Sequence, residues 1–234
     1  MKADLHIHTS YSYDAISSPK EVVKTAILRG INCICITDHG EIKGAIEVLK
    51  AGFDQDILVI PGIEIQSKLG DVLGINVKKI IPDGLSLEET VKEIRKQGGM
   101  AVIPHPFAWP PWPAAAARAF LGKEKDLLLA EAIEAFNATL FNFSNKKALN
   151  FIQKHNLPFT AGSDAHSANS VGKAFIEIAK RNPLSPEGVL EEIRNKRVKL
   201  GGKAFTLLEL LKEHFKIEFK NLVKNGFGSK KRKI

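Results

Sequence analysis

The sequence predicts an α/β protein whose parallel strands close, or nearly close, into a barrel. Stretches typical of strands and of helices alternate about seven times along the 234 residues, with no internal repeat and no low-complexity linker. One strand, at residues 31–37, is a continuous apolar run, as in a parallel sheet covered on both faces. Polar side chains able to do chemistry stand at or just after the predicted strand ends, where such barrels gather their functional residues.

In the first half of the chain, two helix starts are clear. Ser18 and Glu21 form a capping box with Pro19 at the first helical position, and Ser86 and Glu89 form a second box. The predicted helices cover residues 19–29, 42–51 and the stretch from Ser86 to Gly98. We expect strands at residues 3–8, 31–37, 57–60, 63–65 and 70–77, with Pro61 and Gly62 separating the third from the fourth.

The second half continues the same alternation. We expect strands at residues 100–103, 133–136, 159–161, 173–178 and 198–200, and helices at 144–155, from Ser185 onward, and at 206–223. Residues 107–117, rich in proline, tryptophan and alanine, are predicted to form a long loop into a short helix that partly covers a site. The last helix is expected to pack on the outside of the domain. We interpret residues 1–225 as one domain and residues 226–234 as a basic, flexible tail.

Composition and charge narrow the class of protein. Hydrophobic residues make up 44% and charged residues 26%, which is ordinary for a globular domain. With no run of eighteen apolar residues and no leader-like N-terminus, we expect a cytoplasmic protein without a membrane segment. The tail supplies much of the net charge of +8, and is either simply solvated or a contact for nucleic acid. Cys33 and Cys35 share one face of a strand and are interpreted as small buried hydrophobes.

The candidate site begins at the first predicted strand. His6 and His8 stand two residues apart, so their imidazoles leave the strand on one face and could hold one metal ion. Imidazoles and carboxylates recur at later strand ends, and this donor set suits zinc, manganese or iron. Nine candidates exceed the needs of one ion and indicate two or three ions sharing a bridging carboxylate: His6, His8, Asp14, His39, Glu64, Asp71, His105, Asp164 and His166. His155 and His214 fall on helices and are excluded.

Five motifs, in this order and spacing, resemble those of the polymerase and histidinol phosphatase (PHP) superfamily. They are Asp4-Leu5-His6-Ile7-His8-Thr9, Thr37-Asp38-His39-Gly40, Gly62-Ile63-Glu64, His105-Pro106 and Gly162-Ser163-Asp164-Ala165-His166. The resemblance implies a distorted barrel of seven β/α units, with a trinuclear metal site at the C-terminal ends of the strands and phosphoesterase activity.

The resemblance also implies a distribution of ligands. His6, His8, Glu64 and Asp164 would hold the first metal. Glu64 would bridge to a second, held with His105 and Asp71, and Asp14, His39 and His166 would hold the third. The family often has histidine where this chain has Asp71, which is therefore either a ligand or a turn residue. Asp38 is interpreted as orienting His39 or a backbone amide, and Ser163 as a turn residue.

The expected reaction is hydrolysis of a phosphomonoester by a metal-bridging hydroxide, with catalytic roles for Glu64, His39, Asp164 and His166. His39, His166 or a metal-bound water would protonate the leaving oxygen. The nearest candidate for the phosphate is Arg118, with Lys43 or Lys68 as substitutes. Trp109 and Trp112 either stack on a base or pack within their own loop, and we favour a nucleotide or oligonucleotide end over another small phosphorylated molecule. The alternatives are a non-catalytic module of this fold that binds nucleic acid or a protein through its tail, and a metal-dependent amidohydrolase.

Overall fold

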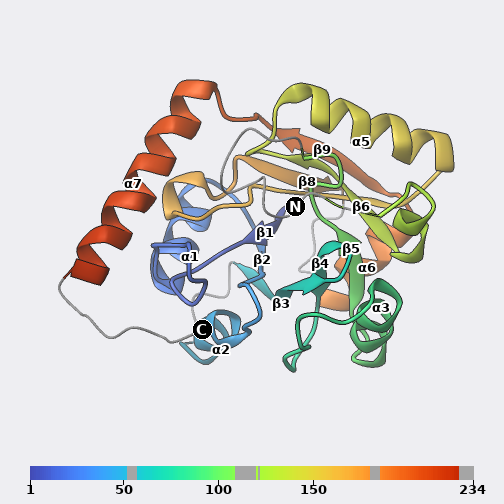
Figure 1. Ribbon diagram of the computed structural model, residues 1–234, viewed down its shortest axis with the longest axis horizontal. Helices are drawn as coiled ribbons and strands as arrows, with labels where there is room; N and C mark the ends of the chain where they lie inside the picture. The colour runs from blue at the N-terminus through green and yellow to red at the C-terminus, as the bar shows by residue number, and fades with distance from the viewer. Residues whose placement is uncertain (52–56, 109–119, 121, 180–184, 227–234) are drawn as a thin grey trace.

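The computed structural model describes residues 1–51, 57–108, 120, 122–179 and 185–226. Its strands are β1 (Lys2–Ile7), β2 (Cys33–Ile36), β3 (Leu58–Ser67), β4 (Gly70–Ile75), β5 (Met100–Ile103), β6 (Ala132–Asn137), β7 (Phe159–Gly162), β8 (Ala174–Ile178) and β9 (Val198–Gly202). Its helices are α1 (Pro19–Leu28), α2 (Lys43–Ala51), α3 (Leu87–Lys96), α5 (Asn142–His155), α6 (Pro186–Arg194) and α7 (Leu207–Gly226), with short 3-10 turns at Asp126–Leu129 and Ala168–Ser170. Figure 1 shows their arrangement.

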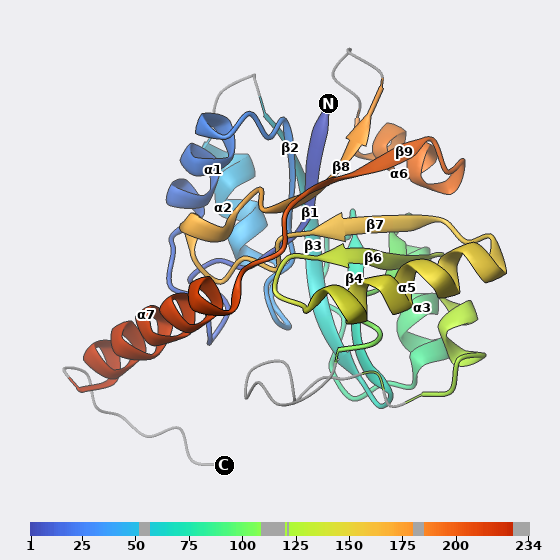
Figure 2. The same cartoon turned by 90° about the horizontal axis from the view of Figure 1, so that it is seen from above.

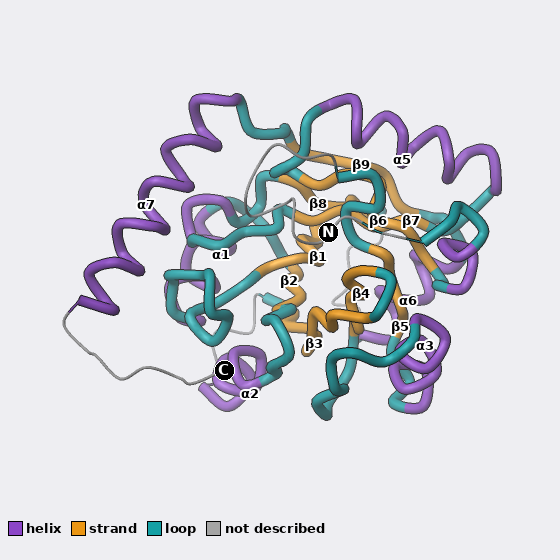
Figure 3. The backbone as a smooth tube through the Cα atoms, in the orientation of Figure 1, coloured by secondary structure: helices purple, strands orange, loops and turns teal. Residues whose placement is uncertain are grey.

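The sheet curls into a nearly closed barrel, which confirms the predicted fold class. Its nine strands lie in the order β7-β6-β5-β4-β3-β2-β1-β8-β9. The first residues of β1 pair with β8, whereas its last residues meet the turn after β7, where Asp164 N donates to His6 O (2.8 Å) and His8 N to Ala165 O (2.9 Å). The barrel therefore closes at the end where His6 and His8 lie. Figure 3 shows β1 between β8 and β2.

The prediction of an entirely parallel sheet was wrong. β4 runs antiparallel to both β3 and β5, and β8 and β9 are also antiparallel to their neighbours. Only residues 68 and 69 separate β3 from β4, and a parallel crossover needs a dozen or more residues. Because β4 is reversed, its first residues lie at the same barrel end as the last residues of β3.

The expected interruption at Pro61 and Gly62 was also wrong, because β3 continues through both. Residues up to Pro61 pair with β2, and residues from Gly62 onward pair with β4. Proline, which has no N–H to donate, thus stands where the strand changes partners. A Cβ on Gly62 would lie 2.6 Å from Cys35 Sγ, so only glycine fits beside β2 without displacing it.

The barrel interior is an apolar core below the candidate site. Side chains of the strands, among them Leu5, Ile60 and Met100, form one cluster with Val189 and Leu190 of α6. Helix α6 therefore packs against the barrel end opposite the candidate site. Cys33 and Cys35 lie in this core as free thiols, and burial raises the pKa of each, as expected for small hydrophobes rather than metal ligands.

The remaining helices cover the outside of the sheet. Both predicted capping boxes are present, at Ser18–Glu21 and Ser86–Glu89. Helix α7 lies at the periphery and extends away from the barrel (Figure 2). Glu209 pairs with Lys173 (2.6 Å), and Glu213 accepts from Ser167 and Ser170, whereas Phe215 and Phe219 are exposed. No helix in the described part of the chain is long and apolar enough to cross a membrane.

Candidate metal centre

The two histidines of β1 reach the mouth of the barrel because the strand carries a bulge. The register with β2 shifts between Asp4 and Ile7. Leu5 belongs to the interior core, whereas Ile7 belongs to the cluster under α1 and α2. Since a bulge turns the following side chains to the other face of a strand, His6 and His8 can point inward above Leu5. Both imidazoles are fully buried.

Two other site residues, His105 and Asp164, follow strand ends and have unusual backbone conformations. His105, just after β5, has φ +33°, and Asp164, just after β7, has φ +51°. Residues other than glycine rarely adopt positive φ, and such strain concentrates at functional sites. Gly162 also matters here, because a Cβ would lie 2.3 Å from the Cβ of His6. These features bring the end of β7 directly against β1.

Glu64, near the middle of β3, lies at the centre of the cluster. Its Oε2 lies 3.0 Å from Nδ1 of His39, 3.2 Å from Nε2 of His8 and 3.5 Å from Nε2 of His6. Its Oε1 lies 3.4 Å from Nε2 of His105. The carboxylate of Glu64 therefore faces four imidazoles.

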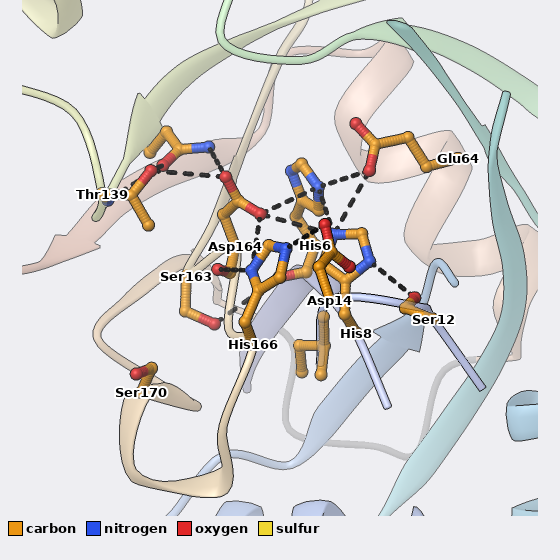
Figure 4. Close-up of polar contacts among 12 residues, drawn as sticks. His6, His8, Ser12, Asp14, Glu64, Thr139, Ser163, Asp164, His166 and Ser170 are labelled. Atoms are coloured by element: carbon orange, nitrogen blue, oxygen red, sulfur yellow. Dashed lines mark hydrogen bonds and ion pairs between the residues drawn. The ribbon is translucent and has the colours of Figure 1, made fainter. Parts of the chain in front are cut away.

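Asp164 faces the same centre from the opposite wall. Its Oδ1 lies 3.3 Å from Nε2 of His8, and 3.5 Å from both Nε2 of His6 and Nδ1 of His166. Figure 4 shows the two carboxylates of Glu64 and Asp164 with the His6 and His8 rings between them. Asn137 Nδ2 and Thr139 Oγ1 each donate to the other oxygen of Asp164 at 3.3 Å, which fixes the carboxylate's orientation.

Asp14 completes the outer side of the centre. Its Oδ2 lies 3.2 Å from Nε2 of His39 and 3.4 Å from Nε2 of His166. The His8 ring contacts the rings of both His39 and His166, with centroid distances of 4.4 and 4.3 Å. The side chains of His39 and His166 are 10% and 21% exposed, whereas those of His6 and His8 are fully buried.

Two buried contacts set the tautomers of the inner histidines. Nδ1 of His6 lies 3.0 Å from Oε1 of Glu134, a carboxylate that can only accept. Nδ1 of His8 lies 3.1 Å from Oγ of Ser12, which donates its own hydrogen to Asp38 (2.9 Å). Each Nδ1 therefore carries a hydrogen, which leaves Nε2 of each ring as the atom that can ligate a metal at the centre.

The donor set fits bound cations. The Nε2 atoms of His6 and His8 lie 3.2 Å apart, and the oxygens of Glu64 and Asp164 lie beside them. No described donor gives either oxygen of Glu64 a well-aligned hydrogen bond. Four buried atoms that can each ligate a metal, and that face one another, are stable when they share a cation. Nitrogen and oxygen donors without thiolate suit zinc, manganese or iron.

Seven of the donors fall into three groups, each with atoms within 4.8 Å of one another: His6, His8 and Asp164; His6, Glu64 and His105; and His8, His39 and His166. The groups overlap through His6 and His8, so ions bound in them would be neighbours. This arrangement can place more than one cation around a phosphate-sized ligand.

The electrostatics of the cluster agree with this chemistry. Burial alone would lower the pKa of His39, but Glu64 and Asp14 raise it to about 11. Burial likewise opposes the effect of Glu64 on His105, whose pKa rises to about 9. His8 differs, because burial and the charges of His166 and His39 lower its pKa to about 3. The imidazole charges hold the pKa of Glu64 well below its usual range, against the effect of burial.

Asp71 is buried beside this centre but belongs to none of the three groups. Asp71 pairs with Gln66 across the hairpin of β3 and β4. Because Gln66 and Glu64 stand two residues apart in β3, Asp71 lies on the same face of the sheet as Glu64. Burial, and then the Glu64 charge, raise the pKa of Asp71 to about 8. Asp71 thus lies next to the group formed by His6, Glu64 and His105. Its role as a metal ligand stays a prediction.

The structure thus brings the nine residues predicted from the sequence to one end of the barrel: the distances above link eight of them, and Asp71 is buried beside those eight. Arg118, Trp109 and Trp112, and the tail beyond Gly226, lie outside the described residues. Lys43 pairs with Glu41 (2.7 Å). Asp38 accepts from the backbone N–H of Thr9 (2.6 Å), the second of its two predicted roles.

Sequence reasoning missed Glu134 and Ser12, which orient the inner histidines. A lone glutamate inside the apolar strand Ala132–Asn137 was a usable signal, because a buried carboxylate needs donors. Ser12 gave no such signal, since it is one of several serines in a polar loop.

Comparison with known proteins agrees with the fold and the site. The PHP domain model matches residues 4–166, and the PHP-associated model matches residues 142–198. An uncharacterized protein of Methanocaldococcus jannaschii is 39% identical over 148 residues, which are 59% of this chain and 82% of that protein.

Two solved structures share the fold. One is a two-domain protein from Bacteroides vulgatus that contains a predicted PHP-like metal-dependent phosphoesterase (TM-score 0.67, 21% identity, covering 92% of this chain and 69% of that one). The other is endonuclease Q in complex with a 27-mer duplex substrate carrying an abasic lesion (TM-score 0.63, 18% identity, covering 98% and 67%). Fold, site and family match define a metal-dependent phosphoric ester hydrolase. The chain belongs to the PHP domain family.

Proposed function

We propose that this hydrolase removes phosphate from a phosphomonoester, using two or three divalent ions held by the barrel-mouth cluster. The observation that carries the proposal is the position of Glu64 and Asp164, which face one another across the imidazoles of His6 and His8. Shared carboxylates of this kind hold neighbouring ions. Zinc, manganese and iron all suit the donors.

Divalent ions supply two things in such a site: they lower the pKa of a coordinated water from about 15.7 to near 7, and they offset charge on the phosphoryl oxygens. The chain supplies the geometry. Glu134 and the Ser12–Asp38 pair keep the Nε2 atoms of His6 and His8 directed at the centre. Glu64 and Asp164 hold the shared centre from opposite walls.

The outer side of the cluster is the side from which the ester approaches. His39 and His166 are more accessible than His6 and His8, which are fully buried. An imidazole released from its ligand role there can give a proton to the leaving oxygen. We therefore include His39 and His166, with Glu64 and Asp164, among the catalytic residues of the proposal.

The substrate class includes nucleotides, oligonucleotide ends and other small phosphorylated molecules. Endonuclease Q, with the same fold, was solved with a 27-mer duplex substrate, which supports including nucleic acids among the substrates. A protein that kept the fold only to dock nucleic acid through its tail would be free to lose donors, and eight predicted donors remain clustered here.

The test is phosphate release by protein loaded with manganese or zinc, across nucleoside monophosphates, 5′-phosphorylated oligonucleotides, sugar phosphates and histidinol phosphate. We expect release from at least one class, and loss of at least 100-fold in Glu64→Gln. Glu93→Gln, which changes a surface carboxylate paired with Lys96 (2.5 Å), is the matched control. Silence across the panel from metal-loaded protein, with salt-sensitive binding of nucleic acid, would support the binding module instead.

A further inference from the structure

An exposed tyrosine stands at the mouth of the metal centre. Tyr13 lies between Ser12 and Asp14, and its ring stacks on the ring of His39, with centroids 5.2 Å apart and planes inclined by 22°. Tyr13 is 68% exposed, whereas the His39 side chain is 10% exposed. The tyrosine ring is therefore the outer member of a stacked pair whose inner member is a candidate metal ligand.

The backbone on both sides of Tyr13 is fixed. Ser12 N donates to Thr9 O (2.8 Å), Ser10 N to Ser17 O (2.7 Å) and Ile16 N to His166 O (2.9 Å). Ser12 Oγ also accepts from His39 N (3.1 Å). The two neighbours of Tyr13 in the sequence, Ser12 and Asp14, both contact histidines of the centre. The position of the Tyr13 ring relative to the centre is therefore set before any substrate binds.

From these observations we propose that Tyr13 forms a subsite for the base of a nucleoside phosphate whose phosphate occupies the metal centre. The inference rests on the proposed phosphoesterase function and narrows its substrate class. An aromatic platform stacks on the face of any base, and such a contact contributes about 1–3 kcal/mol per base. A sugar phosphate offers no flat ring to this platform. Tyr13 therefore favours nucleoside phosphates without choosing among bases.

Tyr11 provides a matched control in the same loop. Its hydroxyl donates to Oε2 of Glu47 in α2 (2.8 Å), so the side chain is directed toward that helix. It is 41% exposed and makes no described contact with the imidazoles of the centre. Tyr11→Ala removes a tyrosine of the loop without removing the proposed platform.

The experiment compares adenosine 5′-monophosphate with glycerol 2-phosphate, which presents a phosphate without a base. The metal-loaded 234-residue chain is assayed for kcat/KM on each compound, and the ratio of the two values is the result. We expect wild type to prefer the nucleotide, Tyr13→Ala to lose that ratio about tenfold, and Tyr13→Phe and Tyr11→Ala to keep it.

Calorimetric dissociation constants for the same two compounds provide a second readout and are compared in the same way. A ratio that stays unchanged in Tyr13→Ala would overturn the proposal and show that the ring only shields His39, as would a wild type without preference for the nucleotide. If neither compound is hydrolysed, the phosphoesterase proposal fails for them, and the ratio of dissociation constants still decides for or against the base subsite.

Discussion

Oε1 of Glu134 lies 3.0 Å from Nδ1 of His6, and Oε2 of the same carboxylate accepts from the backbone N–H of His105 (2.8 Å) and from Nδ2 of Asn137 (2.9 Å). The buried side chain of Glu134 in β6 thus orients the ring of His6 in β1, and it also holds the backbone at His105, just after β5. The centre depends on this carboxylate although Glu134 is not among the predicted ligands.

Glu134→Gln should weaken metal binding about 10- to 100-fold, because outer partners of ligating histidines affect affinity to that extent. Glutamine has one acceptor oxygen, whereas Glu134 uses two to meet three donors. The measurement is metal content after dialysis against a chelator of known affinity, with circular dichroism to confirm the fold.

Glu192→Gln is the control for that change. Glu192 is also a buried carboxylate, but it pairs with Arg197 (2.8 Å) in the α6 region, far from the imidazoles. A folded Glu134→Gln protein that retains as much metal as Glu192→Gln would show that His6 needs no orienting carboxylate.

Ser12→Ala should have a smaller effect on the same centre. Ser12 Oγ receives contacts from His8 Nδ1 and His39 N and donates to Asp38 (2.9 Å), so the change leaves buried donors without this acceptor. We expect a loss of about 1–3 kcal/mol in the free energy of unfolding and weaker metal binding. Denaturant titration with and without metal measures both, and a variant equal to wild type in both states would contradict the role of this hydroxyl.

Gly162→Ala tests how β7 closes against β1. A methyl group there would lie 2.3 Å from the Cβ of His6 and 2.7 Å from its backbone nitrogen. Since neither strand can yield without moving the centre, we expect a loss of about 1–3 kcal/mol of stability together with reduced metal content. Thermal unfolding followed by metal analysis measures the two effects. Wild-type values for both would mean that the barrel is not closed tightly at this point.

Much of this fold was predictable from local signals. Both capping boxes, the positions of the strands and the gathering of polar side chains at strand ends follow from residue patterns within short windows. The direction of β4 does not follow from such patterns, because an apolar strand has the same residue pattern whether it runs parallel or antiparallel to its neighbour. Only the short turn after Ser67 indicates that β4 is antiparallel to β3. The strand break predicted at Pro61 was wrong for a related reason. A single strand can pair with one neighbour over its first residues and with another over its last, as β3 does with β2 and β4.

The site shows the same division between local and distant information. His6 and His8 were predicted from their spacing, but the bulge that directs them inward depends on the register with β2. Glu134 reaches His6 across 128 residues of sequence, so no local pattern connects them. What the sequence could not show was which polar residues serve as partners of the ligands.

Metal loading should release protons at neutral pH. Glu64 and neighbouring carboxylates raise the pKa of His105 to about 9 and that of His39 to about 11, against the effect of burial. Without metal these imidazoles hold protons at pH 7, and a metal must displace them. Apparent affinity should therefore rise with pH, more steeply below about 9, where both imidazoles are protonated, than between about 9 and 11, where only His39 is. Calorimetry in buffers of different ionisation enthalpy counts the protons, and an affinity independent of pH between 6 and 9 would contradict these assignments.

The most direct test of the whole account is to titrate manganese into chelator-treated protein while counting bound metal and measuring phosphate release from the best substrate of the panel. We predict no release without metal, release that appears as at least a second equivalent binds, and none from Glu64→Gln at any manganese concentration tested. Release by the metal-free protein, or full release by Glu64→Gln, would contradict a phosphoesterase centre built around this shared carboxylate.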